Sequence, residues 1–305
     1  MQWQDYKSEI QIIDLPLLRE KNIQLSILRE DLIHPEISGN KYRKLKYNFI
    51  KAKELGFQKV LTFGGAFSNH IAATAAAAHL NGFEALGIIR GEEIASFISD
   101  NPTLSFAQAQ GMQFNFVSRE EYRAKETSEY LEKLAQNYPD YYIIPEGGTN
   151  QEAIKGCEEI LHQDCNTYDF ITCAIGTAGT VTGLLNAKQM HQKVLGFPAL
   201  KGDFFSKEIR KLTENEGYTI IDKYHFGGYG KVSEDLINFI NSFKKETNIP
   251  LDPIYTGKMM YGLLDLIKID YFSSGSKILF VHTGGLQGIK GINKLLMKKN
   301  KTIIE

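Results

Sequence analysis

A lysine follows a Gly-Asn pair in the segment Ser38–Leu45, which reads SGNKYRKL. The run from Ile23 to Leu32 before it is typical of a strand, and the residues after it are typical of a helix. Glycine permits a tight bend and asparagine tolerates turn conformations, so we expect Lys41 to point out of this turn. An amine held in one direction can form a Schiff base with a carbonyl compound. Taken alone, the motif would also fit a solvated lysine at a helix start, and Arg43 and Lys44 are interpreted as such surface charges.

A second turn carries a serine, an asparagine and a histidine in the sequence GGAFSNH. The run Lys59–Phe63 before it predicts a short buried strand, and the Ala-rich block after it predicts a packed helix that ends at Asn81-Gly82. Ser68 and Asn69 therefore lie where a helix begins, and the N–H groups and positive end of a helix favour a carboxylate there. Ordinary capping of the helix is the alternative, because serine and asparagine cap helices without any ligand.

A third and a fourth turn also follow predicted strands and contain small and polar residues. Asp169–Ile175 predicts a strand, and the loop Gly176–Thr180 that follows it (GTAGT) combines small residues with hydroxyls, a composition suited to cradling a phosphate. The loop is neither a Walker loop nor a G-x-G-x-x-G fingerprint. The fourth turn, HTGG with Thr283 in it, follows the apolar strand Lys277–Val281.

The elements that must position these turns alternate between strands and helices. Strands are predicted at Lys59–Phe63, Glu84–Ile89, Gln113–Val117, Tyr141–Ile144, Asp169–Ile175, Val194–Phe197 and Lys277–Val281. Helices are predicted at Arg119–Gln136, Gln151–His162, Ser233–Glu246 and Gly257–Ile267. Such alternation predicts an α/β protein with parallel sheets that bind ligands at the carboxyl ends of their strands. No repeat, linker or shift in composition marks a domain boundary.

The composition is that of an ordinary globular protein. The 305 residues are 43% hydrophobic and 23% charged, which is enough for one large or two medium domains. A formal net charge of −1 makes nucleic acid an unexpected partner. The first ten residues hold no apolar signal segment and no stretch is long enough to span a membrane, so we expect a cytoplasmic protein. Three cysteines without C-x-x-C spacing favour neither disulfides nor a metal site, and Cys157 and Cys173 are interpreted as core residues.

Five motifs occur in an order that resembles a known family. They are SGNKYRKL, GGAFSNH, GTAGT, DPIYTGK and HTGG, and together they span about residues 20–290. The resemblance is to the 1-aminocyclopropane-1-carboxylate (ACC) deaminases and D-cysteine desulfhydrases, which are pyridoxal-phosphate (PLP) enzymes of the tryptophan-synthase-β-like fold. It implies two parallel-sheet α/β domains with the active site in the cleft between them. Residues 1–43 and 153–305 would form the large domain and residues 44–152 the small inserted one.

The resemblance also implies roles for single residues. Lys41 would carry the cofactor, and Ser68 and Asn69, with His70 beside them, would bind the substrate carboxylate, Asn69 also lying near the 3-oxygen of the cofactor. Tyr255 would lie over the substrate, so that Lys41, Ser68 and Tyr255 would be the catalytic residues. The phosphate would be held by Gly176, Thr177, Ala178, Gly179 and Thr180. Family members are homodimers, and we expect the same here.

Two positions separate the branches of the family. ACC deaminases carry a glutamate after the tyrosine and a leucine in the fourth motif, whereas this chain has Thr256 and Thr283. A carboxylate facing the pyridine nitrogen keeps it protonated, whereas a threonine hydroxyl supplies only a neutral hydrogen bond. Expulsion of a good leaving group such as sulfide needs less electron withdrawal than opening of a cyclopropane. The pair of threonines therefore predicts α,β-elimination of D-cysteine to pyruvate, ammonia and sulfide, with ACC deamination as the alternative.

Some residues depart from the family pattern. Ala66-Phe67 replaces the commoner Ile/Val-Gln before Ser68, and the segment Tyr224–Gly230 differs from its deaminase equivalent. That segment is either a loop at the substrate entrance, with Tyr229 on the substrate, or a packed turn. The shape around Phe67 and Tyr229 could favour a substrate other than D-cysteine. A PLP-binding protein without turnover and a nucleotide-binding α/β protein are the other hypotheses, but the second lacks both phosphate fingerprints.

Overall fold

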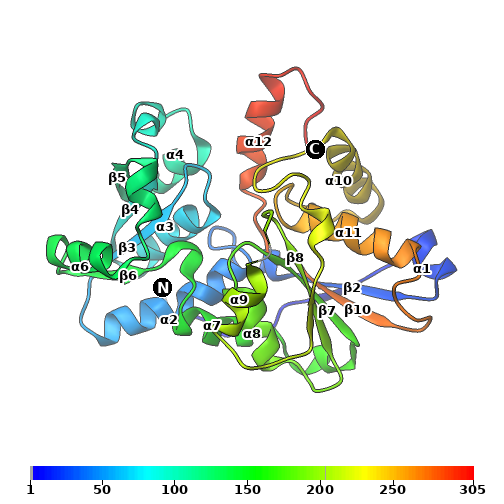
Figure 1. The fold of residues 1–305 in the computed structure, drawn as a ribbon. Coiled ribbons are helices and arrows are strands. Elements are labelled where there is room, and N and C mark those ends of the chain that lie inside the picture. Colours follow the sequence, from blue (N-terminus) through cyan, green and yellow to red (C-terminus); the bar gives the residue numbers. More distant parts are fainter. Residues whose placement is uncertain (1–2, 203) are drawn as a thin grey trace.

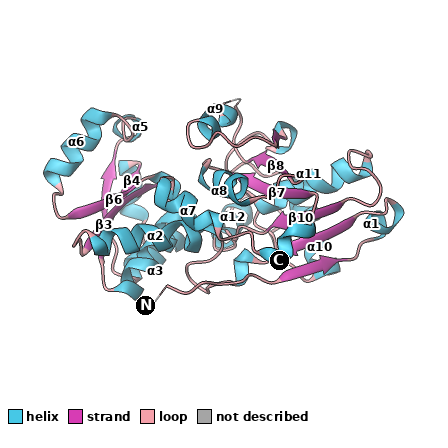
Figure 2. Ribbon diagram, turned by 90° about the horizontal axis from the view of Figure 1, so that it is seen from below, coloured by secondary structure: helices cyan, strands magenta, loops and turns pink. Residues whose placement is uncertain are grey.

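The computed structural model describes residues 3–202 and 204–305 and contains two separate β-sheets flanked by helices (Figure 1). One sheet has six strands in the order β1-β2-β10-β7-β8-β9, and the other has four in the order β5-β4-β3-β6. The two sheets lie in different halves of the molecule in both ribbon views (Figure 2). The predicted α/β class with parallel sheets is confirmed.

The six-stranded sheet is assembled from both ends of the chain. Its strands are β1 (Ile10–Ile13), β2 (Gln24–Leu28), β7 (Phe170–Ile175), β8 (Lys193–Pro198), β9 (Tyr218–Ile220) and β10 (Lys277–Val281). All neighbouring pairs are parallel except β1 and β2, which are antiparallel, so the sheet has one antiparallel edge strand. The central strands are buried, apolar and rich in Ile, Leu, Val and Phe, as expected for strands covered on both faces.

The four-stranded sheet is parallel throughout. Its strands are β3 (Lys59–Gly64), β4 (Glu84–Arg90), β5 (Gln113–Val117) and β6 (Tyr141–Ile144). Each was predicted to within one residue at either end. Because the strands are parallel, the turns that follow β3, β4 and β6 open at one edge of this sheet.

The helices cover the faces of both sheets. They are α1 (Pro16–Glu20), α2 (Asn40–Glu54), α3 (Asn69–Asn81), α4 (Pro102–Ala109), α5 (Arg119–Arg123), α6 (Ser128–Asn137), α7 (Gln151–Glu158), α8 (Gly179–Ala187), α9 (Phe205–Arg210), α10 (Glu234–Thr247), α11 (Thr256–Lys268) and α12 (Gly288–Met297). No helix within the described part of the chain is long and apolar enough to cross a membrane.

Several predicted boundaries were wrong. The helix predicted at Arg119–Gln136 is two helices, because Thr127 accepts a hydrogen bond from Tyr130 N and begins α6 as a new helix. The helix predicted to reach His162 ends at Glu158 as α7. Of the strand-like run to Leu32, only β2 pairs with other strands, and Glu30–Leu32 forms a turn of 3₁₀ helix.

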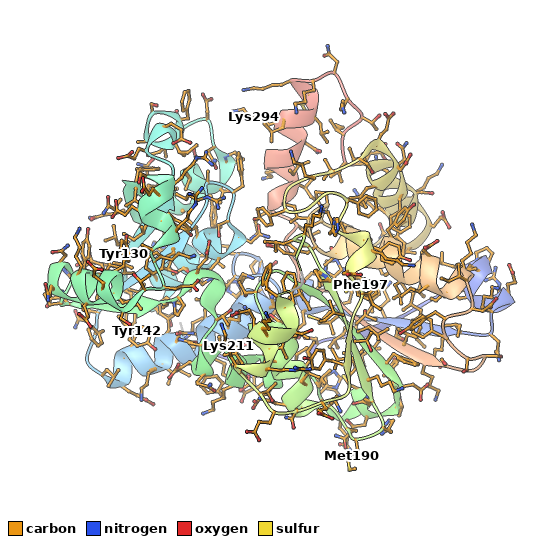
Figure 3. All side chains as sticks on the ribbon, viewed as in Figure 1. Tyr130, Tyr142, Met190, Phe197, Lys211 and Lys294 are labelled. Carbon is orange, nitrogen blue, oxygen red and sulfur yellow. The ribbon has the colours of Figure 1, made fainter. Side chains whose placement is uncertain are left out.

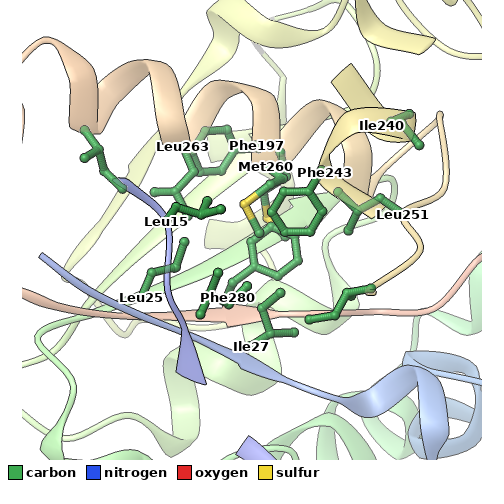
Figure 4. Close-up of a cluster of buried hydrophobic side chains, with 14 of the residues drawn as sticks. Leu15, Leu25, Ile27, Phe197, Ile240, Phe243, Leu251, Met260, Leu263 and Phe280 are labelled. Atoms are coloured by element: carbon green, nitrogen blue, oxygen red, sulfur yellow. The ribbon is translucent and has the colours of Figure 1, made fainter. Parts of the chain in front are cut away.

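The largest hydrophobic core fills the space between the six-stranded sheet and its helices (Figure 4). Ile27 of β2 and Phe280 of β10 face Met260 of α11 and Phe243 of α10 in this core. Phe197 of β8 belongs to the same core, whereas Tyr142 lies in the other half of the molecule (Figure 3). Burial of a side chain of this size stabilises the fold by about 1.5–3 kcal/mol.

Helices α2, α7 and α8 join the two halves by close packing that requires glycine. A Cβ on Gly156 of α7 would lie 1.9 Å from the carbonyl oxygen of Arg43 in α2. A Cβ on Gly183 of α8 would lie 2.4 Å from the Cβ of Cys157 in α7. The interpretation of Arg43 as a surface charge was wrong, because its side chain is 1% exposed and forms an ion pair with the buried Glu30 at 2.8 Å. This packing fixes the helix that carries Lys41.

Candidate active site

A cavity of about 650 Å³ lies between the two halves, and residues of the four turns that the sequence analysis identified line it. That volume is typical of small-molecule sites. The predicted site residues on its wall are Lys41, Ser68, Asn69, His70, Gly176, Thr177, Thr180, Tyr229, Tyr255 and Thr283. Three predicted residues, Ala178, Gly179 and Thr256, are buried but do not line the cavity.

Lys41 lies in the first turn of α2, and the residue that precedes this helix, Gly39, has no room for a side chain. Gly39 has φ +66°, and a Cβ there would lie 2.0 Å from the carbonyl oxygen of Thr283. The Lys41 ammonium donates to Asn40 Oδ1 at 3.0 Å, and Asn40 Nδ2 donates to Thr180 Oγ1 at 2.8 Å. Burial, and then the positive charge of Lys44, lower the pKa of Lys41 to about 7. A substantial fraction of this amine is therefore neutral, and hence nucleophilic, near neutral pH.

Lys44 is the largest departure from the sequence interpretation, because its side chain is buried rather than on the surface. Its Nζ donates to Gly147 O at 2.9 Å, Thr177 Oγ1 at 3.0 Å and Thr149 Oγ1 at 3.3 Å. None of these oxygens is anionic, and burial lowers the pKa of Lys44. A buried ammonium without a negative partner is costly, so this position is suited to an anionic ligand.

The loop Gly176–Thr180 ends β7 and begins α8 beside this ammonium. A Cβ on Gly179 would lie 3.2 Å from Lys44 Nζ, and a Cβ on Gly176 would lie 2.8 Å from the Tyr255 ring. No side chain caps α8, so its first N–H groups remain available to a ligand. An uncapped helix N-terminus with a buried ammonium beside it has the donors and the charge that a phosphate group requires.

Ser68 and Asn69 lie at the start of α3, as predicted. The Ser68 hydroxyl accepts a hydrogen bond from Ile71 N at 3.4 Å and therefore caps the helix, so the capping interpretation is confirmed. Binding of a substrate carboxylate by the same turn remains a prediction. The Asn69 side chain lies close to the loop after β10, 3.1 Å from the position of a Cβ on Gly285.

His70 is buried, and the hydrogen bonds of Thr62 favour the tautomer with its proton on Nε2. Thr62 donates its hydroxyl proton to Ile144 O at 2.9 Å, so its oxygen accepts from His70 Nε2 at 2.8 Å. His70 Nδ1 is then an acceptor without a partner in the described structure. Burial and the positive charges of Lys41 and Lys44 lower the pKa of His70 well below 6.5.

Two tyrosines from different segments meet at the cavity. The rings of Tyr229 and Tyr255 are 6.2 Å apart between centroids and lie edge to face. Burial raises the pKa of Tyr255 well above 10, so its hydroxyl keeps its proton at neutral pH. Lys258 of α11 holds the segment that carries Tyr229, because its Nζ donates to His225 O and Gly228 O, each at 2.9 Å.

Thr256 and Thr283, which were expected to separate the branches of the family, differ in their surroundings. The Thr256 hydroxyl is fully buried and donates to Asp252 Oδ1 at 2.8 Å, so the expectation that it faces a ligand does not match its position. Asp252 also accepts hydrogen bonds from the backbone N–H groups of Ile254, Tyr255 and Thr256. Thr283 does line the cavity, and no described residue hydrogen-bonds its hydroxyl.

Four charged residues on the wall were not predicted as site residues: Lys44, Arg90, Arg119 and Glu146. Arg90 and Arg119 lie at the ends of β4 and just after β5, the same edge of the sheet as the GGAFSNH turn. Their positions at the ends of predicted strands were the one feature of the sequence that could have identified these two arginines as site residues. Within residues 3–202 and 204–305, no three His, Cys, Asp or Glu side chains are grouped to hold a metal ion.

Comparison with known proteins gives a consistent family. Residues 7–284 match the family model described as pyridoxal-phosphate dependent enzyme. A Pyrococcus abyssi protein provisionally named an ACC deaminase is 32% identical over 89% of this chain and 87% of its own length. An Arabidopsis thaliana protein named bifunctional D-cysteine desulfhydrase/ACC deaminase is 31% identical over 87% of this chain and 73% of its own length.

Comparison with solved structures agrees with the comparison of sequences. A crystal structure described as an ACC deaminase homologue superimposes with a TM-score of 0.81 at 28% identity, covering 96% of this chain and 94% of the other. A hydrogen sulfide-producing enzyme from Fusobacterium nucleatum has a TM-score of 0.65 at 16% identity over 92% of this chain and 96% of its own, which shows a shared fold only.

Proposed function

Since the chain belongs to the family of pyridoxal-phosphate-dependent enzymes, we propose that it catalyses α,β-elimination of D-cysteine to pyruvate, ammonia and sulfide. The cofactor is pyridoxal 5′-phosphate, and the cavity suits it. Lys41 would hold the cofactor covalently, while Lys44, Thr177 and the uncapped start of α8 would hold its phosphate. When bound, the cofactor withdraws electrons from the α-carbon of the substrate and makes its α-proton removable.

Residues around the cavity would bind the substrate, accept its α-proton and donate a hydrogen bond to the leaving group. The N–H groups at the start of α3, with Ser68 and Asn69, would bind the substrate carboxylate and orient the α-proton. The neutral amine of Lys41 would accept that proton, for which a pKa of about 7 is well matched. The protonated hydroxyl of Tyr255 would donate a hydrogen bond to the departing sulfur, and Tyr229 would hold Tyr255 in place.

The preference for D-cysteine over ACC rests on one observation. Glu146 is the only carboxylate on the described wall of the cavity, and it is already bound to the Tyr122 hydroxyl at 2.6 Å and to Lys125 at 3.1 Å. The hydroxyl of Thr283 is free on that wall, and Asp252 is saturated by its four donors. A pyridine nitrogen in this cavity would therefore meet a neutral partner, which favours elimination of a good leaving group over ring opening.

ACC deamination is the second candidate, because the Pyrococcus abyssi relative is provisionally named for it and the Arabidopsis thaliana relative is named for both activities. A panel of D-cysteine, β-chloro-D-alanine, D-serine, L-cysteine and ACC, assayed for keto-acid formation, distinguishes the two. Pyruvate from D-cysteine supports the proposal, and 2-oxobutanoate from ACC as the main product contradicts it. Absence of any keto acid with PLP bound would favour a protein without turnover.

A further inference from the structure

Arg90 is a charged residue of the described cavity wall to which the proposed function gives no role. It is the last residue of β4, and Nη2 lies 3.5 Å from the position of a Cβ on Gly65, which also lines the cavity. Its guanidinium lies over the ring of Tyr122, with Cζ 5.7 Å from the ring centroid. No hydrogen bond or ion pair joins the guanidinium to any described residue, so Tyr122 orients the charge without neutralising it.

The other charged residues that lie on the cavity wall beside the four-stranded sheet, Arg119 and Glu146, are already paired. Arg119 forms an ion pair with Glu93 at 2.6 Å. Glu146 is bound by Lys125 at 3.1 Å and by the Tyr122 hydroxyl at 2.6 Å. The positive charge of Arg90 is therefore the net charge that this wall presents to a ligand.

Arg90 lies apart from the phosphate site already described, on the same sheet edge as the turn that carries Ser68 and Asn69. Lys44 and the loop Gly176–Thr180 lie on α2 and α8, whereas Arg90 lies at the open edge of the four-stranded sheet. Across the cavity is Tyr229, whose pKa is raised by burial and lowered in part by the charge of Arg90. Ser68, Tyr255, Arg90 and Tyr229 all line this cavity, so a substrate held at Ser68 shares the cavity with the Arg90 guanidinium.

We propose that Arg90 binds a negatively charged group on the β-substituent of the substrate. The best substrates would be amino acids whose leaving group is an anion, a phosphate ester or a sulfonated sulfur, because a guanidinium binds such planar or tetrahedral oxyanions with paired hydrogen bonds. This inference rests on the proposed β-elimination. With O-phosphoserine, the α-proton leaves, the Cβ–O bond breaks and its electron pair departs with inorganic phosphate. The resulting 2-aminoacrylate is hydrolysed to pyruvate and ammonia, with no oxidation or reduction.

The test compares substrates that differ in the charge of the leaving group. Wild-type holoenzyme, Arg90→Gln and Arg90→Lys are assayed with O-phosphoserine and S-sulfocysteine, each as D and L isomers, and with β-chloro-D-alanine. Arg123→Gln is the matched control, since Arg123 is exposed on α5 and does not line the cavity. We expect Arg90→Gln to lower kcat/KM for the anionic substrates about 10- to 100-fold, and far less for chloroalanine. Arg90→Lys should restore part of the loss, and Arg123→Gln should change nothing.

Other outcomes contradict the inference. Equal losses for charged and uncharged substrates would mean that Arg90 binds the α-carboxylate, and no loss would mean that it binds neither group. If the wild type eliminates chloroalanine but neither anionic substrate, the proposed function stands and the role of Arg90 is wrong. If nothing is turned over, the proposed function fails, and binding still tests Arg90: D-aspartate should perturb the cofactor absorbance at lower concentration than D-alanine, and Arg90→Gln should remove that difference.

Discussion

Lys41 and Lys44 lie three residues apart in α2, so both side chains leave the same face of the helix. Their separation brings two ammonium groups together in a buried site, and each makes the other harder to protonate. Lys44 keeps three oxygen acceptors, whereas Lys41 has one. We therefore expect Lys44 to be the protonated amine of the pair and Lys41 to be the neutral, nucleophilic one.

The reactivity of Lys41 should follow its lowered pKa. Because the neutral amine is the nucleophile, the rate at which apoenzyme binds pyridoxal should rise with pH around a midpoint near 7, whereas an ordinary lysine would react only above about pH 9. Lys44→Met should move the midpoint to higher pH, because removal of a neighbouring positive charge raises the pKa of Lys41. The probe is pyridoxal, which has no phosphate, so Lys44→Met cannot change the rate through a lost contact to a phosphate group. A midpoint near 10 in the wild type, or borohydride labelling of Lys44 or Lys46 in place of Lys41, would contradict the assignment.

Ser68 has two tasks that substitution can separate. Ser68→Ala should cost about 0.5–2 kcal/mol of stability through loss of the cap on α3. It should also cost about 1–3 kcal/mol of transition-state binding if the hydroxyl contacts the substrate carboxylate, seen as a lower kcat/KM with PLP content unchanged. Ser233→Ala is the control, because Ser233 caps α10 through Leu236 N at 3.2 Å and does not line the cavity. Loss of PLP with turnover intact after reloading would show that Ser68 does not contact the substrate.

At the scale of elements, the start of α11 and the segment 225–230 act as one unit. Tyr255 immediately precedes α11, and Lys258 in its first turn holds the loop that carries Tyr229. The loop needs such support, since Phe226, Gly227, Gly228 and Gly230 all have positive φ. Burial lowers the pKa of Lys258 to about 8, and even the neutral amine has two N–H groups for its two carbonyl acceptors.

Removal of the Lys258 ammonium should release this loop. Lys258→Met leaves two carbonyls without their donor, at about 1–3 kcal/mol of stability, and should lower kcat/KM while PLP stays bound. Lys258→Met should lower kcat/KM by a smaller factor in a Tyr229→Phe background than in the wild type, because the effects of two residues that act through one contact are not additive. Lys268→Met, at the exposed end of α11, is the control for thermal midpoint and kinetics. Full additivity of the two substitutions would show that Lys258 does not act through Tyr229.

At the scale of the whole molecule, strands and turns could be predicted because apolar runs and Gly-Asn or Gly-Gly bends are local signals. The burial of Arg43 and Lys44 could not, because it depends on tertiary contacts with Glu30, 13 residues earlier in the chain than Arg43, and with Gly147, 103 residues later than Lys44. The direction of the Thr256 hydroxyl was missed for a related reason, since the motif gives its position but not its bond to Asp252. The domain boundaries at residues 43 and 152, the homodimer and the cytoplasmic location stay predictions.

The central claim is that this cavity, without a free carboxylate for the pyridine nitrogen, is built for β-elimination. The most direct test is the ratio of kcat/KM for D-cysteine to kcat/KM for ACC, measured on the wild-type holoenzyme, because this ratio reports differential stabilisation of the two transition states. We expect a ratio well above one, with sulfide and pyruvate formed in equal amounts. A ratio below one would contradict the account and make ring opening of ACC the reaction of this enzyme.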